Sequence, residues 1–167
     1  MSGLRAGIVG FGLAGEVFHA PLIDAVDGID VACVVTTDPE RQARVRAAYP
    51  NANVVPDVEQ LWDAVDVLVI ATPNRAHVPL GLAAVERGMP VVVDKPLAPS
   101  ADDGERLVEA AEAAGAKLTV FQNRRLDGDF LTLRALLERG ELGTVTRFES
   151  RFERFRPQVG DGWRELG

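Results

Sequence analysis

The sequence predicts an α/β fold in which a doubly wound parallel sheet, residues 1–121, precedes a second and incomplete α+β domain, residues 122–167. Short apolar runs alternate with helix-like segments throughout the first part. The runs lack an alternation of apolar and polar residues, which is typical of parallel strands covered by helices on both faces. Residues 1–121 carry 9 basic and 17 acidic side chains and residues 122–167 carry 9 and 8, so the composition also changes at this boundary.

Six apolar runs in residues 1–121 are predicted to be strands. They are Leu4–Val9, Val31–Thr36, Asn53–Val55, Val67–Ala71, Val91–Asp94 and Leu118–Phe121. Because helix-like segments separate them, consecutive strands are expected to be parallel and joined by right-handed crossovers.

Three helices are predicted between these runs: Pro39–Tyr49, His77–Arg87 and Ala101–Ala114. Asp38 is placed to cap the first of them, where a proline at the first helical position also favours a helix start. Ser100 and Asp103 resemble a capping box before the third helix, which is expected to end at Gly115.

The second unit begins with a predicted helix, Asp129–Arg139, whose apolar spacing turns three residues inward: Phe130, Leu133 and Leu137. Val145–Phe155 then predicts one long strand with Phe148 and Phe152 on the same face. A lone strand cannot cover its apolar face or pair its edges. We therefore expect this unit to be incomplete and to form a homo-oligomer through the strand region.

Composition excludes several classes of function. The net charge of −7 argues against nucleic-acid binding, and the absence of an uninterrupted apolar stretch of 18 residues argues against a membrane span. The N-terminus has no signal-peptide pattern. The single cysteine, Cys33, forbids an intrachain disulfide and is expected in the core, which fits a cytoplasmic protein. Since no cluster has metal-ligand spacing, we expect no metal site.

The strongest motif is a glycine-rich turn between the first predicted strand and the next helix. Its residues match G-x-G-x-x-G and are Gly10, Phe11, Gly12, Leu13, Ala14 and Gly15. Gly10 would permit the tight turn, Gly12 would let a pyrophosphate approach the backbone, and Gly15 would let the helix pack closely. The pattern in this context predicts a Rossmann domain that binds NAD(P), the alternative being a glycine-rich turn without a ligand.

Residues at the end of the second strand bear on the choice between NAD and NADP. Thr36 occupies the position where NAD-binding domains usually carry an acidic residue. Thr37 and Arg41 could also bind a 2′-phosphate, which favours NADP over NAD. Asp38 would repel that phosphate if it pointed inward, but a helix cap is an equally good use for it.

Two further signals lie at the predicted carboxyl ends of strands, where such sheets bind ligands. One is Ala71, Thr72, Pro73 and Asn74, with His77 opening the next helix, and the other is Asp94, Lys95 and Pro96. Lys95 could reach a substrate oxygen and assist proton transfer, or it could be an ordinary solvated lysine. For His19, a packing or capping role is favoured over a catalytic one. Trp62 is expected to lie in the core.

Four runs together resemble the glucose–fructose oxidoreductase, inositol dehydrogenase and rhizopine catabolism (Gfo/Idh/MocA) family: residues 10–22, 71–74, 94–96 and 121–131. The resemblance covers essentially the whole chain. Phe18 and His19 with the Asn123–Arg124–Arg125 run make it most similar to the NADP-dependent scyllo-inositol dehydrogenase branch.

The resemblance implies an oxidoreductase acting on a secondary hydroxyl of a sugar or inositol-like polyol, with Lys95 at the reacting oxygen and the nicotinamide. It also implies that Thr72–Asn74 and His77 line the nicotinamide ribose, and that Asn123 and Arg124 border the sugar pocket. The family's Asp-x-x-x-His element is missing from these residues. We therefore expect cofactor binding with little turnover; the alternatives are a nucleotide-sensing or partner-binding module, half of a split enzyme, or an incomplete sequence.

Overall fold

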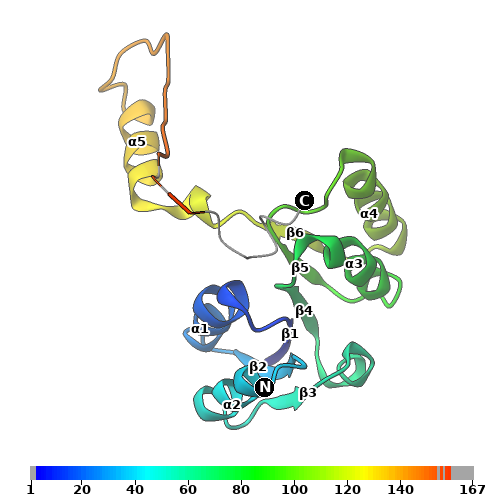
Figure 1. Ribbon diagram of the computed structural model, residues 1–167. Coiled ribbons are helices and arrows are strands. Elements are labelled where there is room, and N and C mark those ends of the chain that lie inside the picture. The colour runs from blue at the N-terminus through cyan, green and yellow to red at the C-terminus, as the bar shows by residue number, and fades with distance from the viewer. Residues whose placement is uncertain (1–2, 154, 156, 159–167) are drawn as a thin grey trace. The chain divides into compact units, whose positions relative to one another are not determined.

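The computed structural model describes residues 3–153, 155, 157 and 158. The chain forms two compact units, Met1–Phe121 and Gln122–Gly167 (Figure 1). Among the described residues, no helix has the length and apolar character needed to cross a membrane.

The first unit is built on six parallel strands in the order β3-β2-β1-β4-β5-β6. Their bounds are Leu4–Val9 (β1), Ile29–Val35 (β2), Asn53–Val55 (β3), Val67–Ile70 (β4), Val91–Asp94 (β5) and Leu118–Phe121 (β6). β1 pairs with both β2 and β4, so the strand order reverses beside its carboxyl end. This order is that of the dinucleotide-binding sheet, and the predicted doubly wound α/β fold is confirmed.

Helical segments connect the strands. They are a π-helix, η1 (Ala14–His19); α1 (Ala20–Asp24), α2 (Pro39–Ala48), α3 (His77–Val85) and α4 (Ala101–Ala114); and three 3₁₀ turns, η2 (Val58–Gln60), η3 (Trp62–Ala64) and η4 (Asn74–Ala76). The predicted caps form: the carboxylate of Asp38 accepts from the backbone of Glu40 and Arg41, and the Ser100 hydroxyl accepts from Asp103 N–H. Gly115 ends α4 with a φ of +65°, a conformation that suits glycine.

Apolar side chains form one core on each face of the sheet, with α1 and α2 over one face and α3 and α4 over the other (Figure 1). Successive residues of a strand point to opposite faces. Leu68 and Ile70 of β4 therefore join the α3–α4 core, while Val69 joins the core beneath α1 and α2. Cys33 and Trp62 are both buried, as the sequence predicts, although Trp62 lies in a short 3₁₀ turn.

The second unit contains a 3₁₀ turn, η5 (Asn123–Leu126), and α5 (Gly128–Glu138). The predicted strand Val145–Phe155 is wrong for the described residues 145–153 and 155, none of which is in a strand. A strand is held by hydrogen bonds to a neighbouring strand, and the described part of this unit offers none. The helix is also less buried than predicted, since Phe130 and Leu137 are each 43% exposed.

Candidate functional site

The glycine turn joins the carboxyl ends of β1, β2 and β4. Gly10 has a φ of +95°, and a Cβ added there would lie 2.7 Å from the carbonyl oxygen of Ala71, just beyond β4. The N–H of Gly10 donates to Val35 O on β2 at 3.0 Å. Glycine is required here both for its backbone conformation and for the lack of space.

The other two glycines differ in what surrounds them. A Cβ on Gly15 would lie 2.2 Å from Gly10 O, so only glycine lets the helical segment approach the turn so closely. A Cβ on Gly12 would meet a single neighbour, Nη1 of Arg41 at 3.9 Å. Gly12 is therefore an open patch of backbone beside a guanidinium group, and the turn fits a pyrophosphate.

The helical segment after the turn begins as a π-helix and continues directly into α1. The glycine-rich turn predicts a helix here but not its π-helical start. Gly12 O accepts from Glu16 N–H at 2.9 Å, and the Glu16 carboxylate pairs with Arg44 Nε of α2 at 2.7 Å. This link between η1 and α2 was not predicted, because nothing in the spacing of two residues 28 apart indicates it.

Asp38 caps α2 rather than pointing to an open site. Its Oδ1 accepts from the N–H groups of Glu40 and Arg41 at 2.9 and 3.2 Å, and its Oδ2 lies 3.2 Å from Arg41 Nε. The hydrogen bond from Arg41 N–H is the main cause that holds the pKa of Asp38 below its usual value. Thr36 is buried, and its hydroxyl accepts from Asp38 N–H at 3.4 Å, while Thr37 is exposed. The charge of Arg41 thus lies between Asp38 and Gly12.

The segment after β4 carries one buried and unpaired polar atom. Among the described residues, Thr72 Oγ1 has no hydrogen-bond partner. Buried hydroxyls are almost always hydrogen-bonded. Thr72 follows Ala71, the residue that contacts Gly10, and so lies beside the glycine turn. Its unpaired hydroxyl fits a site that receives a polar ligand.

His77 connects this segment to the one after β5. Its ring is 1% exposed, with Nε2 2.9 Å from Thr72 O and Nδ1 2.8 Å from Pro96 O. A carbonyl oxygen only accepts, so a ring nitrogen that carries a proton donates to the carbonyl it faces. The ring therefore holds two loops together, a structural task that the sequence did not indicate.

Lys95 follows β5 directly and is exposed. Its N–H donates to Asp94 Oδ1 at 2.9 Å, and the Lys95–Pro96 peptide bond is cis. Asp94 ends β5 on the same face of the sheet as η1. Its charge acts on His19, whose pKa is lowered by burial and to a lesser extent raised by Asp94.

Asn123 and Arg124 belong to the second unit, where they lie in η5. Arg124 Nη1 pairs with Asp127 Oδ2 at 2.7 Å, and its guanidinium lies 5.9 Å from the centre of the Phe152 ring. The carboxylate of Asp127 raises the pKa of Arg124. Their predicted place beside a sugar pocket stays a prediction.

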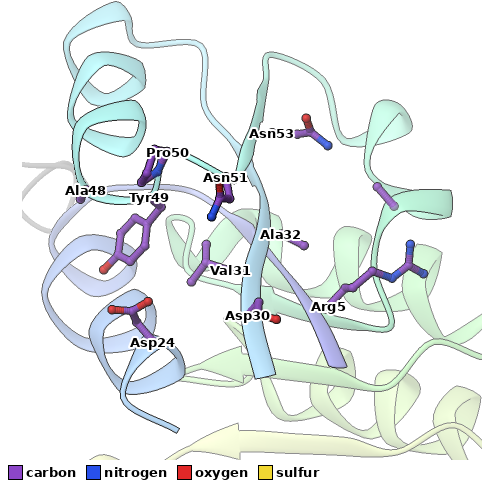
Figure 2. A pocket seen from close by; sticks show the side chains of 11 residues that line it. Arg5, Asp24, Asp30, Val31, Ala32, Ala48, Tyr49, Pro50, Asn51 and Asn53 are labelled. Atoms are coloured by element: carbon purple, nitrogen blue, oxygen red, sulfur yellow. The ribbon is translucent and has the colours of Figure 1, made fainter. Parts of the chain in front are cut away.

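A pocket of about 540 Å³ opens at the other end of the sheet (Figure 2). Asp24 and Tyr49 lie on one side of β2 and Arg5 on the other, close to the amino ends of β1 and β2. Nη2 of Arg5 forms an ion pair with Oδ1 of Asp66 at 2.8 Å. Ligands of such sheets bind at carboxyl ends, so this pocket is separate from the glycine turn. No group of metal-ligating residues occurs in the described part of the chain.

Residues 4–122 match the family model GFO_IDH_MocA, described as an oxidoreductase family with an NAD-binding Rossmann fold. The chain is 45% identical over 98% of its length to the uncharacterized oxidoreductase YdgJ of Escherichia coli, covering 47% of that protein. It is 35% identical over 97% of its length to scyllo-inositol 2-dehydrogenase (NADP(+)) IolW of Bacillus subtilis, covering 45% of it. The chain thus spans about half the length of the curated relatives it matches.

Solved structures of oxidoreductases also match this chain. YPO2259 of Yersinia pestis superposes with a TM-score of 0.90 at 42% identity, over 99% of this chain and 47% of that one. The WlbA dehydrogenase of Bordetella pertussis, in complex with NADH and UDP-GlcNAcA, superposes with a TM-score of 0.74 at 28% identity, over 84% and 41%.

Proposed function

This chain belongs to the Gfo/Idh/MocA family of oxidoreductases with an NAD-binding Rossmann fold, and we propose that it binds NADP(H), or NAD(H), at the carboxyl ends of β1 and β4. The single observation that carries the proposal is the glycine turn. Gly10 and Gly15 have no room for a side chain, while Gly12 presents open backbone next to Arg41. A phosphate can approach such a surface, and the following helical segment directs free N–H groups toward it.

The remaining parts of the cofactor are assigned along the same edge. Thr36, Thr37 and Arg41 would take the adenosine ribose, with Arg41 beside a 2′-phosphate. Residues after β4 and β5 would take the nicotinamide end: Ala71, Thr72, Pro73, Asn74, His77, Asp94, Lys95 and Pro96. The unpaired hydroxyl of Thr72 supports this assignment.

The choice of NADP over NAD rests on the second strand's end. Asp38 is occupied as a helix cap and ion-paired to Arg41, so its negative charge is partly neutralised. The name of the relative IolW includes NADP(+), whereas the WlbA structure contains NADH. We favour NADP because an arginine, rather than a carboxylate, faces the turn.

We propose a sugar or inositol-like polyol as the substrate of the whole protein, since named relatives include inositol 2-dehydrogenases. The nicotinamide, when bound, supplies or accepts a hydride at the carbon that bears a secondary hydroxyl. Lys95 would donate to the reacting oxygen and exchange its proton. Asn123 and Arg124 would border the sugar.

Low turnover is expected from these residues alone. Lys95 is the one group we assign to proton transfer, because both histidines are buried. His77 is held between two carbonyls and His19 is buried. We further propose a cytoplasmic location, on the single buried cysteine, and a homo-oligomer formed through the region of Phe148 and Phe152.

Fluorescence titration with NADPH tests the proposal. Gly12→Ala should fold normally, because its methyl meets only Arg41 Nη1 at 3.9 Å, yet it should weaken NADPH binding at least tenfold by blocking the phosphate. Gly104→Ala, on α4 and away from the turn, is the matched control, since its methyl would meet only the side chains of Ala98 and Leu97, at 3.7 and 3.8 Å. No saturable binding by the unmodified chain at millimolar NADPH or NADH would refute the proposal.

A further inference from the structure

His19 combines deep burial with an unpaired nitrogen. Its side chain is 4% exposed, and within the described residues Nε2 has no hydrogen-bond partner. Burying a polar atom without a partner costs free energy, so such atoms are rare and call for an explanation. A purely apolar side chain of the same shape would serve packing better. Packing alone therefore does not account for a histidine at this position.

The surroundings of His19 place it at the Lys95 end of the site. Its ring centre lies 4.4 Å from that of Phe121, the last residue of β6, with 49° between the ring planes. Asp94, the last residue of β5, is the register partner of Phe121 on β6, and its charge raises the pKa of His19 against the stronger lowering by burial. The imidazole thus lies beneath the ends of two neighbouring strands.

Asp94 also contacts the backbone of Lys95. One oxygen of its carboxylate, Oδ1, accepts the backbone N–H of Lys95 at 2.9 Å. A carboxylate accepts at both oxygens, so Oδ2 can take a second donor. Nε2 of His19, which lacks a partner among the described residues, is such a donor in the tautomer that carries the proton there. In ligand-free sites such hydrogen bonds are often long and shorten when the ligand binds.

We propose that His19 is a positioning residue for Lys95: with its ring held against Phe121, Nε2–H donates to the Asp94 carboxylate as the site takes up its ligand. Asp94 then fixes the position of the Lys95 backbone N–H, and this position limits where the lysine side chain can lie. The inference rests on the proposed function, since Lys95 has a role only there.

Two substitutions separate positioning from packing. His19→Phe keeps an aromatic ring against Phe121 and removes both nitrogens. His19→Gln keeps an N–H donor at nearly the distance of Nε2 from the backbone. If His19 serves packing alone, His19→Phe should leave the surroundings of Lys95 unchanged. If it positions Lys95, His19→Phe should disturb Lys95, and His19→Gln should restore part of the loss.

Lysine-selective labelling gives a measurement that would not change if His19 had a packing role alone. The sequence contains two lysines, so an NMR spectrum of the labelled full chain has two lysine amide signals, with Lys117 as the internal control. On addition of NADP⁺ we expect the Lys95 signal to reach a different position in His19→Phe than in the unmodified chain, while Lys117 stays the same. NADPH affinity should fall about tenfold in His19→Phe, but affinity for 2′-phospho-ADP-ribose, which lacks nicotinamide, should not.

The outcomes distinguish this inference from the proposed function. Absence of NADP(H) binding by the unmodified chain refutes the proposed function and with it this inference. Normal binding, with Lys95 signals and affinity unaltered in His19→Phe, refutes this inference alone. If His19→Phe does not fold, NMR of the unmodified chain with labelled histidine tests the proposal instead. The sequence contains two histidines, so the ring signals of His19 can be told apart from those of His77. An Nε2 without a proton in the NADP⁺ complex overturns the proposal, and a protonated Nε2 that is altered by Asp94→Asn supports it.

Discussion

Nδ1 of His77 lies 2.8 Å from the carbonyl oxygen of Pro96, so one side chain at the start of α3 fastens the loop that carries Lys95. The same ring contacts Thr72 O through Nε2. The loops that follow β4 and β5 are thereby joined through a buried imidazole.

Removing this ring should destabilise the fold. His77→Ala removes the ring that contacts two carbonyl oxygens and opens a cavity, and we expect the free energy of unfolding to fall by about 2–5 kcal/mol. Urea denaturation followed by circular dichroism measures the change. Arg75→Ala alters an exposed side chain of η4 and serves as the control. A loss below about 1 kcal/mol would mean that the imidazole does not hold the loops.

Arg41 should decide between the two cofactors. A guanidinium bound to a 2′-phosphate contributes a charge-assisted hydrogen bond. Arg41→Ala should therefore lower the affinity for NADPH about tenfold or more and change the affinity for NADH little. Arg106→Ala is a matched control, because Arg106 pairs with Asp103 three residues before it, as Arg41 does with Asp38. Equal losses for both cofactors in a fluorescence titration would contradict the preference for NADP.

Asp66 should make stability depend on pH in the acid range. Hydrogen bonds from Arg5 lower the pKa of Asp66 to about 2, below its usual 3.8. A depressed pKa stabilises the folded state above the unfolded pKa, and this contribution is lost as pH falls from about 4 through about 2. The stability difference between the unmodified chain and Asp66→Asn should therefore shrink over that interval. A difference that stays constant from pH 5 to pH 2 in thermal melts would disprove the role of this carboxylate.

Phe148 and Phe152 should drive self-association. They are 67% and 82% exposed, and an apolar surface of this kind lowers its free energy by contact with another copy. We expect the double substitution Phe148→Ser and Phe152→Ser to shift the chain toward the monomer in sedimentation velocity. Val26→Ser, at a residue 56% exposed in the first unit, is the control. An unchanged distribution of species would place the association surface elsewhere.

Local pattern was enough to predict most of the first unit. Four strands begin and end where predicted, because polar or turn residues lie at the limits of each apolar run: Leu4–Val9, Asn53–Val55, Val91–Asp94 and Leu118–Phe121. Ala101–Ala114 is also confirmed at both ends, since Ser100 and Gly115 mark its limits chemically. The family resemblance, carried by short motifs at strand ends, is confirmed by the match over residues 4–122.

The parts that were not predicted depend on contacts distant in sequence. Val145–Phe155 has the period of a strand, but a period alone does not supply the neighbour to which a strand must bond. No local pattern indicates that His77 holds two loops, because its partners are backbone carbonyls, which every residue possesses. The pairing of His19 with Phe121 escaped prediction for a similar reason: 102 residues separate two side chains that the crossover between strands brings together.

The alternation of β4 side chains between the two cores limits which insertions and deletions this strand can tolerate. Leu68 and Ile70 fill one face and Val69 the other. Deleting a single codon within this strand would exchange the faces of every residue after it, and both cores would lose their fit at once. Length variation among natural versions of this unit should therefore be confined to the connections between strands.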